Sequence, residues 1–190
     1  MKYYKYNINE MTDELYERYL GMMSSERRGK LEKKAIRDDR LRTMAGELLV
    51  RRAVSEILGI TEEAVPLCSD ERGAPILEGT GLFVSIAHSG SYVVCAVSHT
   101  PVGIDIEQVR PMCGRVATGT FYKSECEYLA SDGYELSGES LVRFYEIWTT
   151  KEAYAKMTRE GISLKNTIDT TTIPVKRVHF DGYVVSIVTK

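Results

Sequence analysis

The segment 12–58 carries apolar and polar residues at helical spacing. Leu, Met, Arg and Glu dominate it, and apolar side chains that recur every three or four positions are typical of amphipathic helices. Thr12 and Ser24 are of the type that caps helix N-termini, whereas Gly21 and Gly59 are of the type that ends helices. The pattern therefore predicts two or three helices.

The segment 82–98 changes to a strand pattern. Two β-rich runs flank His88-Ser89-Gly90-Ser91, which predicts a hairpin with the histidine in its turn. The later elements are predicted as a strand at 102–107, helices at 115–130 and 141–158 with a loop at Asp132-Gly133 and Ser137-Gly138 between them, and a strand at 183–189.

Both ends of the chain mix helices with strands, so the predicted class is α+β. The change of pattern near residues 99–103 predicts an N-terminal subdomain at 1–101, with the basic helices and the His88 hairpin. A C-terminal subdomain at 102–190 would carry an acidic strand and the helix 144–157.

Composition is that of a globular protein, with 43% hydrophobic and 27% charged residues in a chain of 190. The polar start and the lack of any apolar run of about 18 residues predict neither a secretory signal nor a membrane span. The four cysteines are widely spread with no CxxC pair, which favours reduced thiols in the cytoplasm.

Charge is unevenly distributed along the chain. A net charge of −2 argues against bulk nucleic-acid binding. Segment 26–52 nevertheless holds ten basic residues against five acidic ones. Arg27, Lys30 and Arg42 could bind a phosphate, although a solvated helix face is the usual explanation for such charges.

The strand VGIDIE places two carboxylates on one face. With a side-chain period of two, Val102, Ile104 and Ile106 share one face and Asp105 and Glu107 the other, roughly 7 Å apart at Cα. A magnesium ion would relieve their repulsion because it prefers oxygen ligands. The alternative is an edge strand with a solvated acidic face.

The helix 144–157 offers a third carboxylate. Glu152 and Lys156 lie four residues apart on one face, an arrangement that is also common in surface ion pairs. Together with Asp105 and Glu107, however, Glu152 would complete a magnesium site of the kind that phosphoryl transfer needs.

Two further segments could meet a ligand. His88 and its neighbouring backbone N–H groups could approach a phosphate, or the histidine could simply bond within its turn. Arg72-Gly73-Ala74-Pro75 predicts a tight loop whose backbone could meet a flat ring.

Taken in order, these segments resemble the 4′-phosphopantetheinyl transferases, in particular the long monomeric type typified by surfactin synthetase activators. FVSIAHSG resembles the family's strand ending in Ser-His-Ser, VGIDIE its Gly-Ile-Asp-Ile-Glu, and WTTKEAYAK its Trp-x-x-Lys-Glu-x-x-x-Lys. The similarity runs from about residue 24 to residue 165.

The resemblance implies two similar α/β halves in a sandwich-like fold, related by a pseudo-twofold axis, with coenzyme A in the cleft between them. Magnesium would join its pyrophosphate to Asp105, Glu107 and Glu152. The implied contacts of its ADP end are Arg27, Lys30, Thr43, Arg72, Gly73, Ala74, Ala87 and His88.

The implied reaction moves the phosphopantetheine arm onto a serine of an acyl or peptidyl carrier protein. The implied partners are therefore coenzyme A and the carrier protein, and the implied oligomeric state is a monomer. Glu152 or a metal-bound water would help to deprotonate the serine, and Asp105 would act with them. Lys156 would neutralise the departing adenosine 3′,5′-bisphosphate. Lys151 matches the lysine before the glutamate in the Trp-x-x-Lys-Glu motif, but the resemblance implies no role for it.

Three departures from the family pattern bear on this expectation. Ala74 stands where the family has lysine, Ser85 and Ala87 replace Asn and Ser before the histidine, and the chain is shorter than the best-known long members. Weaker coenzyme A binding is expected. A catalytically impaired coenzyme A or nucleotide-binding module, or a magnesium phosphohydrolase, is the alternative.

Overall fold

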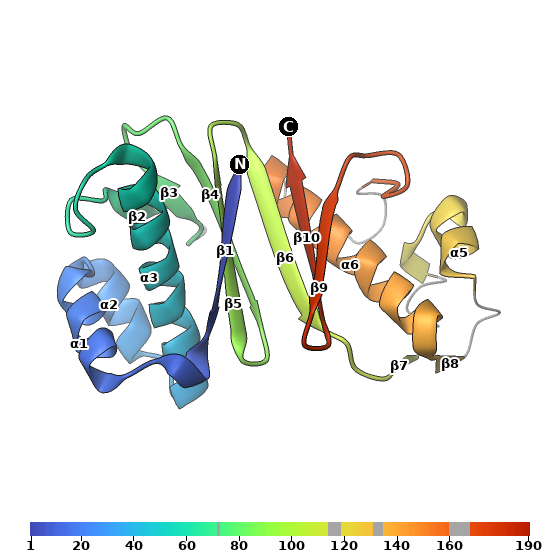
Figure 1. Cartoon of the computed structure of the whole chain (residues 1–190), viewed down its shortest axis with the longest axis horizontal. Coiled ribbons are helices and arrows are strands. Elements are labelled where there is room, and N and C mark those ends of the chain that lie inside the picture. The colour runs from blue at the N-terminus through green and yellow to red at the C-terminus, as the bar shows by residue number, and fades with distance from the viewer. Residues whose placement is uncertain (72, 114–118, 131–134, 160–167) are drawn as a thin grey trace. The chain divides into compact units, whose positions relative to one another are not determined.

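A computed structural model describes residues 1–71, 73–113, 119–130, 135–159 and 168–190 (Figure 1). The chain forms two compact units, Met1–Pro101 and Val102–Lys190. Each unit combines helices with antiparallel sheets, which confirms the α+β class. None of the described helices is both long and apolar enough to cross a membrane.

The first unit contains a three-stranded antiparallel sheet in the order β1-β5-β4. Its strands are β1 (Lys2–Asn7), β4 (Phe83–Ser89) and β5 (Tyr92–Ser98). Gly90 and Ser91 alone form the turn of the β4–β5 hairpin, and Gly90 has the positive φ, 52°, that such turns require. The predicted hairpin is confirmed, but His88 lies at the end of β4 and not in the turn.

Three helices cover the segment 12–58, as predicted. They are α1 (Asp13–Met22), α2 (Ser25–Glu32) and α3 (Arg37–Leu58). Thr12 and Ser24 cap the first two through their side-chain oxygens, and Gly59 ends α3 with a φ of 67°. The helix α1 ends at Met22, one residue beyond the stop expected at Gly21, and it ends without a left-handed residue.

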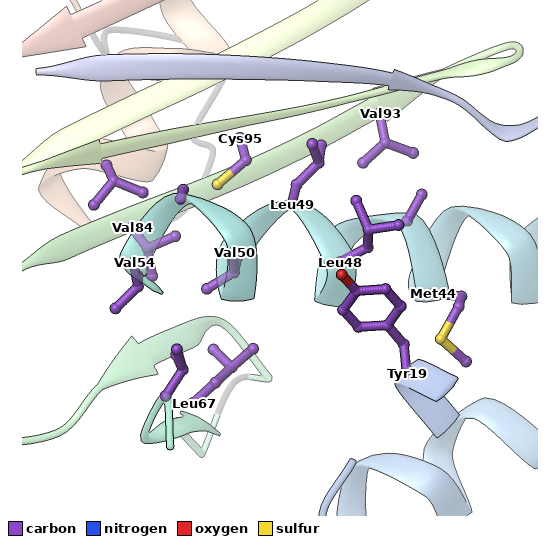
Figure 2. Close-up of a cluster of buried hydrophobic side chains, with 14 of the residues drawn as sticks. Tyr19, Met44, Leu48, Leu49, Val50, Val54, Leu67, Val84, Val93 and Cys95 are labelled. Carbon is purple, nitrogen blue, oxygen red and sulfur yellow. The ribbon is translucent and has the colours of Figure 1, made fainter. Parts of the chain in front are cut away.

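The core of the first unit surrounds α3. Figure 2 shows Leu49 between this helix and β5, the strand that carries Val93 and Cys95, while the side chains of Met44 and Tyr19 lie on another side of α3. A short hairpin of β2 (Leu67–Ser69) and β3 (Pro75–Leu77) and the 3-10 helix η1 (Ile8–Glu10) complete the described elements of this unit.

The second unit has a three-stranded antiparallel sheet in the order β6-β10-β9. Its strands are β6 (Val102–Gln108), β9 (Lys176–Phe180) and β10 (Tyr183–Thr189). The strands predicted at 102–107 and 183–189 are confirmed. The prediction did not include β1 and β9, which are end strands with few buried residues.

The long helix α6 (Gly138–Thr158) packs on β6 and β10, and the short helix α5 (Lys123–Leu129) packs on α6. Two short strands, β7 (Met112–Cys113) and β8 (Glu135–Leu136), pair with each other. Ser137 caps α6, so the loop expected at Ser137-Gly138 is the start of that helix. Positions 115–118 of the predicted helix 115–130, and Asp132-Gly133, lie outside the described residues.

Candidate functional site

Helix α6 lies directly against one face of β6. A Cβ added to Gly103 would stand 1.8 Å from the backbone oxygen of Ala153 and 2.8 Å from the backbone nitrogen of Met157, so only glycine permits this approach. Because strand side chains alternate, Asp105 and Glu107 lie on the same face as Gly103. The two carboxylates therefore face α6.

Asp105 is buried there, with 6% of its surface exposed. Its Oδ1 accepts a hydrogen bond of 2.7 Å from Nζ of Lys156, which also donates to the carbonyl oxygen of Ile104 over 3.3 Å. This burial excludes a solvated acidic face at Asp105. Lys156 makes its ion pair across to β6, unlike the surface pair with Glu152 that helical spacing alone allowed.

Burial and repulsion shape the electrostatics of the site. Burial raises the pKa of Asp105 to about 7, Lys156 opposes this rise, and the charges of Glu107 and Glu152 add to it. The pKa of Glu152 is raised too, chiefly by burial and partly by Glu107, against the effect of Lys156. The three carboxylates are thus close enough to repel one another, in surroundings that penalise negative charge.

The donor set fits a hard cation such as magnesium. Oδ2 of Asp105 is buried and has no hydrogen-bond partner, and a buried oxygen in that state gains most from a ligand. In the described part of the chain, however, no group of three or more acidic, histidine or cysteine side chains could hold a metal ion as it stands. Magnesium coordination by Asp105, Glu107 and Glu152 stays a prediction.

A buried layer of hydroxyl groups holds α6 in register with the sheet. Ser186 on β10 pairs with Asp105 across the strands. Its Oγ lies 2.7 Å from Oγ1 of Thr149 and accepts a hydrogen bond of 3.1 Å from Thr150. Glu152 and Lys156 follow within two turns on the same helix, so this layer fixes where they lie. Helical and strand periodicity do not reveal this layer, although the Thr-Thr pair stands directly before Lys151-Glu152.

Lys151 points away from these carboxylates into a second buried cluster. Its Nζ pairs with Glu125 at 2.8 Å and donates to the carbonyl oxygen of Ile168 at 2.7 Å. Glu125 in turn accepts hydrogen bonds from the backbone N–H groups of Tyr122 and Thr170, each 2.8 Å long. Lys151 therefore joins α5 and residues 168–170 to α6, which gives this motif residue a structural role.

Replacing Lys151 by methionine is expected to lower the free energy of unfolding by about 3–5 kcal/mol, because Glu125 would keep a buried charge without a partner. The double variant Lys151→Met/Glu125→Gln should recover part of the loss. Urea unfolding measures both. Lys123→Met, at a side chain 92% exposed, is the control and should change stability by less than about 0.5 kcal/mol; equal losses at both lysines would contradict the role of the buried pair.

The first unit holds the residues expected to contact coenzyme A. Arg27 is bonded to Glu47 and Ser69, whereas Lys30 forms an exposed pair with Glu26 one turn away. The hydroxyl of Thr43 donates to the carbonyl oxygen of Asp39. Lys30 thus shows the arrangement of a solvated helix face, and Arg27 does not.

The remaining residues expected to contact coenzyme A lie in the loop after β2 and at the end of β4. Gly73 has a φ of 84°, and the backbone N–H of Ala74 donates to the Asp70 carboxylate; Arg72 lies outside the described residues. Ala87 is buried and His88 is exposed. A hydrogen bond from Arg42 lowers the pKa of Asp39, with a small contribution from His88, so this histidine lies near the start of α3.

Comparisons with known proteins cover nearly the whole chain. Residues 101–188 match the 4′-phosphopantetheinyl transferase superfamily, and residues 10–100 match the description "4′-phosphopantetheinyl transferase, N-terminal". The relatives include the 4′-phosphopantetheinyl transferase Sfp of Bacillus subtilis (strain 168), which is 32% identical over 181 residues, or 94% of this chain and 77% of the relative.

Two other relatives are covered over shorter regions. The 4′-phosphopantetheinyl transferase gsp of Aneurinibacillus migulanus is 34% identical over 65% of this chain and 51% of its own length. The 4′-phosphopantetheinyl transferase HetI of Nostoc sp. is 33% identical over 73% of this chain and 60% of its own length.

Proposed function

The chain belongs to the 4′-phosphopantetheinyl transferase superfamily, and on that premise we propose that it transfers the 4′-phosphopantetheine arm of coenzyme A to a serine of an acyl or peptidyl carrier protein. Adenosine 3′,5′-bisphosphate is the second product. The observation that carries the proposal is the buried Asp105 carboxylate, with one oxygen bonded to Lys156 and the other without a partner.

Asp105, Glu107 and Glu152 would hold magnesium, which supplies positive charge to the pyrophosphate of coenzyme A when it is bound. Lys156 keeps 31% of its side chain exposed while it pairs with Asp105. An ammonium group in that position can compensate the charge that develops on the leaving bisphosphate.

Glu152 is the base in this proposal. Its carboxylate is partly buried, and burial raises its pKa, which makes it a stronger base than an exposed glutamate. The carrier serine oxygen forms a bond to the phosphorus that bears the pantetheine arm as its proton passes to Glu152. The bond from that phosphorus to the bridging oxygen breaks, and the bisphosphate leaves with the electron pair.

The first unit would bind the ADP portion of coenzyme A through Arg27, Lys30, Thr43, His88 and the loop 72–74, with Ala87 beside the histidine. Support comes from Arg27 and His88, which remain at least partly exposed. The pseudo-twofold relation of the halves, the cleft between them, the monomeric state and the cytoplasmic location stay predictions.

The test is incubation of the protein with coenzyme A, magnesium and a panel of apo-carriers from fatty-acid, polyketide and peptide assembly, followed by mass spectrometry of each carrier. One phosphopantetheine should be added, and none to a carrier whose acceptor serine is alanine. A folded protein that modifies no member of the panel would refute the proposal.

The alternatives give different results in the same experiment. An impaired binding module, suggested by Ala74 and Ala87, would bind coenzyme A without transfer. A phosphohydrolase would release its product to water without any carrier. The intact set of Asp105, Glu107, Glu152 and Lys156 argues against an impaired module. A phosphohydrolase would use the same carboxylates, and membership of the transferase family favours transfer over hydrolysis.

Magnesium binding is expected to depend on pH. Because the pKa of Asp105 is raised to about 7, the ion must displace a proton below that pH. Its apparent affinity should rise about tenfold per pH unit up to about pH 7 and then level off. Calorimetric titration with magnesium chloride across this range checks it. An affinity that stays constant between about pH 5 and 8 would contradict the part assigned to Asp105.

A further inference from the structure

Glu47 lies at the centre of a buried ion cluster in the first unit. Its side chain on α3 is fully buried and accepts from two guanidinium groups. Nε and Nη2 of Arg27 both lie 2.8 Å from Oε2, and Nε of Arg51 lies 2.7 Å from Oε1. Two arginines thus share one carboxylate, which leaves one positive charge in excess.

The two arginines differ in what their remaining N–H groups do. Arg51 is 4% exposed, and its Nη atoms donate to the carbonyl oxygens of Glu62 and Met22 within 2.8 Å. Arg27 is 12% exposed, and its Nη1 donates to the hydroxyl of Ser69 over 2.9 Å. Arg51 is therefore held on all sides by protein, while Arg27 keeps an outer edge beside Ser69.

An anion at that edge would balance the excess charge. A cationic group held in low-dielectric surroundings attracts an anion more strongly than a solvated one does. A guanidinium whose orientation is already fixed also loses little rotamer freedom when it binds a phosphate. The hydroxyl of Ser69 accepts from Arg27, so its own proton can be donated to a phosphate oxygen.

The cluster also draws together other residues expected to contact coenzyme A. Thr43 lies one turn before Glu47 on the same face of α3. Ser69 ends β2 and leads into the loop in which the Asp70 carboxylate accepts from the N–H of Ala74. Glu47 thus joins α2, α3 and this loop at Arg27.

We infer that Glu47 is a positioning residue, which fixes the Arg27 guanidinium for a phosphate group of coenzyme A, and that the Ser69 hydroxyl is a further contact of the same phosphate. This inference rests on the proposed function. The fixed pair supplies phosphate contacts in a chain that has Ala74 where the family pattern has lysine.

Calorimetric titration of wild type and Glu47→Gln with adenosine 3′,5′-bisphosphate tests the positioning role. The variant should bind about tenfold more weakly or worse. Its KM for coenzyme A should rise while its KM for the carrier does not change. Glu62→Gln is the matched control, because the Glu62 carboxylate accepts from Arg18 and Tyr19 instead of Arg27, and the change keeps the backbone carbonyl that accepts from Arg51. Its affinity should equal that of wild type.

Arg27→Lys and Ser69→Ala carry the test if circular dichroism shows that Glu47→Gln does not fold. Lysine keeps the charge but lacks the guanidinium group that bridges Glu47 and Ser69, so Arg27→Lys should weaken bisphosphate binding about tenfold. Ser69→Ala should weaken it about threefold to tenfold, because one hydrogen bond is lost. Folded variants that bind like wild type, or an equal loss in Glu62→Gln, would overturn the inference.

Wild-type transfer activity is measured alongside these titrations. Normal transfer with unaffected variants would overturn only the roles of Glu47 and Ser69. Wild-type protein that neither binds the bisphosphate nor modifies any carrier would overturn both the inference and the proposed function.

Discussion

Replacing Gly103 by alanine is expected to lower transfer activity at least about 100-fold, since a displacement of about 1 Å at catalytic groups has that effect. The added Cβ would stand 1.8 Å from the backbone oxygen of Ala153, where side-chain carbons essentially never come closer than 3.0 Å. Backbone cannot rotate away as a flexible side chain would, so α6 must move off β6 by about 1 Å. Glu152 and Lys156 would then leave their places beside Asp105.

The same change should cost about 1–3 kcal/mol of unfolding free energy, which is typical of overpacking. Urea unfolding and carrier mass spectrometry measure the two effects. Gly21→Ala is the matched control, because Gly21 is helical and has no neighbour within 4 Å of its added Cβ. It should keep full activity and gain about 0.5–1 kcal/mol. If Gly103→Ala were as active as wild type, α6 could not hold the catalytic groups against β6 as described.

Replacing Asp105 by asparagine should lower transfer by about two to three orders of magnitude without unfolding the protein. The change removes the charge that the proposed magnesium site needs, and the expected loss corresponds to several kcal/mol of transition-state stabilisation. Asparagine keeps an oxygen that can accept from Lys156. Coenzyme A and carrier titrations at saturating magnesium would separate lost chemistry from lost binding.

Stability provides the internal check on this variant. The pKa of Asp105 is about 7 in the folded protein and 3.8 in the reference state, so ionisation destabilises the fold and wild-type stability falls as pH rises between these values. Asp105→Asn lacks this fall, and its stability relative to wild type should increase across that window. Asp13→Asn, the same change at an exposed position in the first turn of α1, should leave transfer unchanged and lower stability by no more than about 1 kcal/mol. A large drop in the stability of Asp105→Asn near neutral pH would instead identify a structural role.

Edge strands and turns show where prediction from pattern was limited. The strands β1 and β9 have mostly exposed or half-buried residues, including several lysines and arginines, so they lack the clear alternation of a half-buried strand. The cluster of His, Ser and Gly at 88–91 is typical of a turn and predicts that His88 lies in it. The strand pairing continues through Ser89, and only Gly90 has the required positive φ.

The sequence predicted that the carboxylates of the candidate site lie together, but it did not predict how the basic side chains pair. Strand period placed Asp105 and Glu107 on one face, and the family motif added Glu152. Helical spacing suggested Glu152 as the partner of Lys156, but the structure pairs Lys156 with Asp105, which is 51 residues away. The packing of α6 on β6 decides that pairing.

The sequence by itself determined the local structure and the family of this protein. Caps at Thr12 and Ser24, the left-handed Gly59 and the alternation of β6 depend on residues only a few positions apart, so they can be identified without a fold. Only the tertiary structure decided which charges are neutralised and how: Asp105 by Lys156, Glu125 by Lys151, and Glu47 by two arginines. A buried charge pairs with an opposite charge that the packing of distant elements brings within about 3 Å. The order of residues along the chain does not give the distance between such elements.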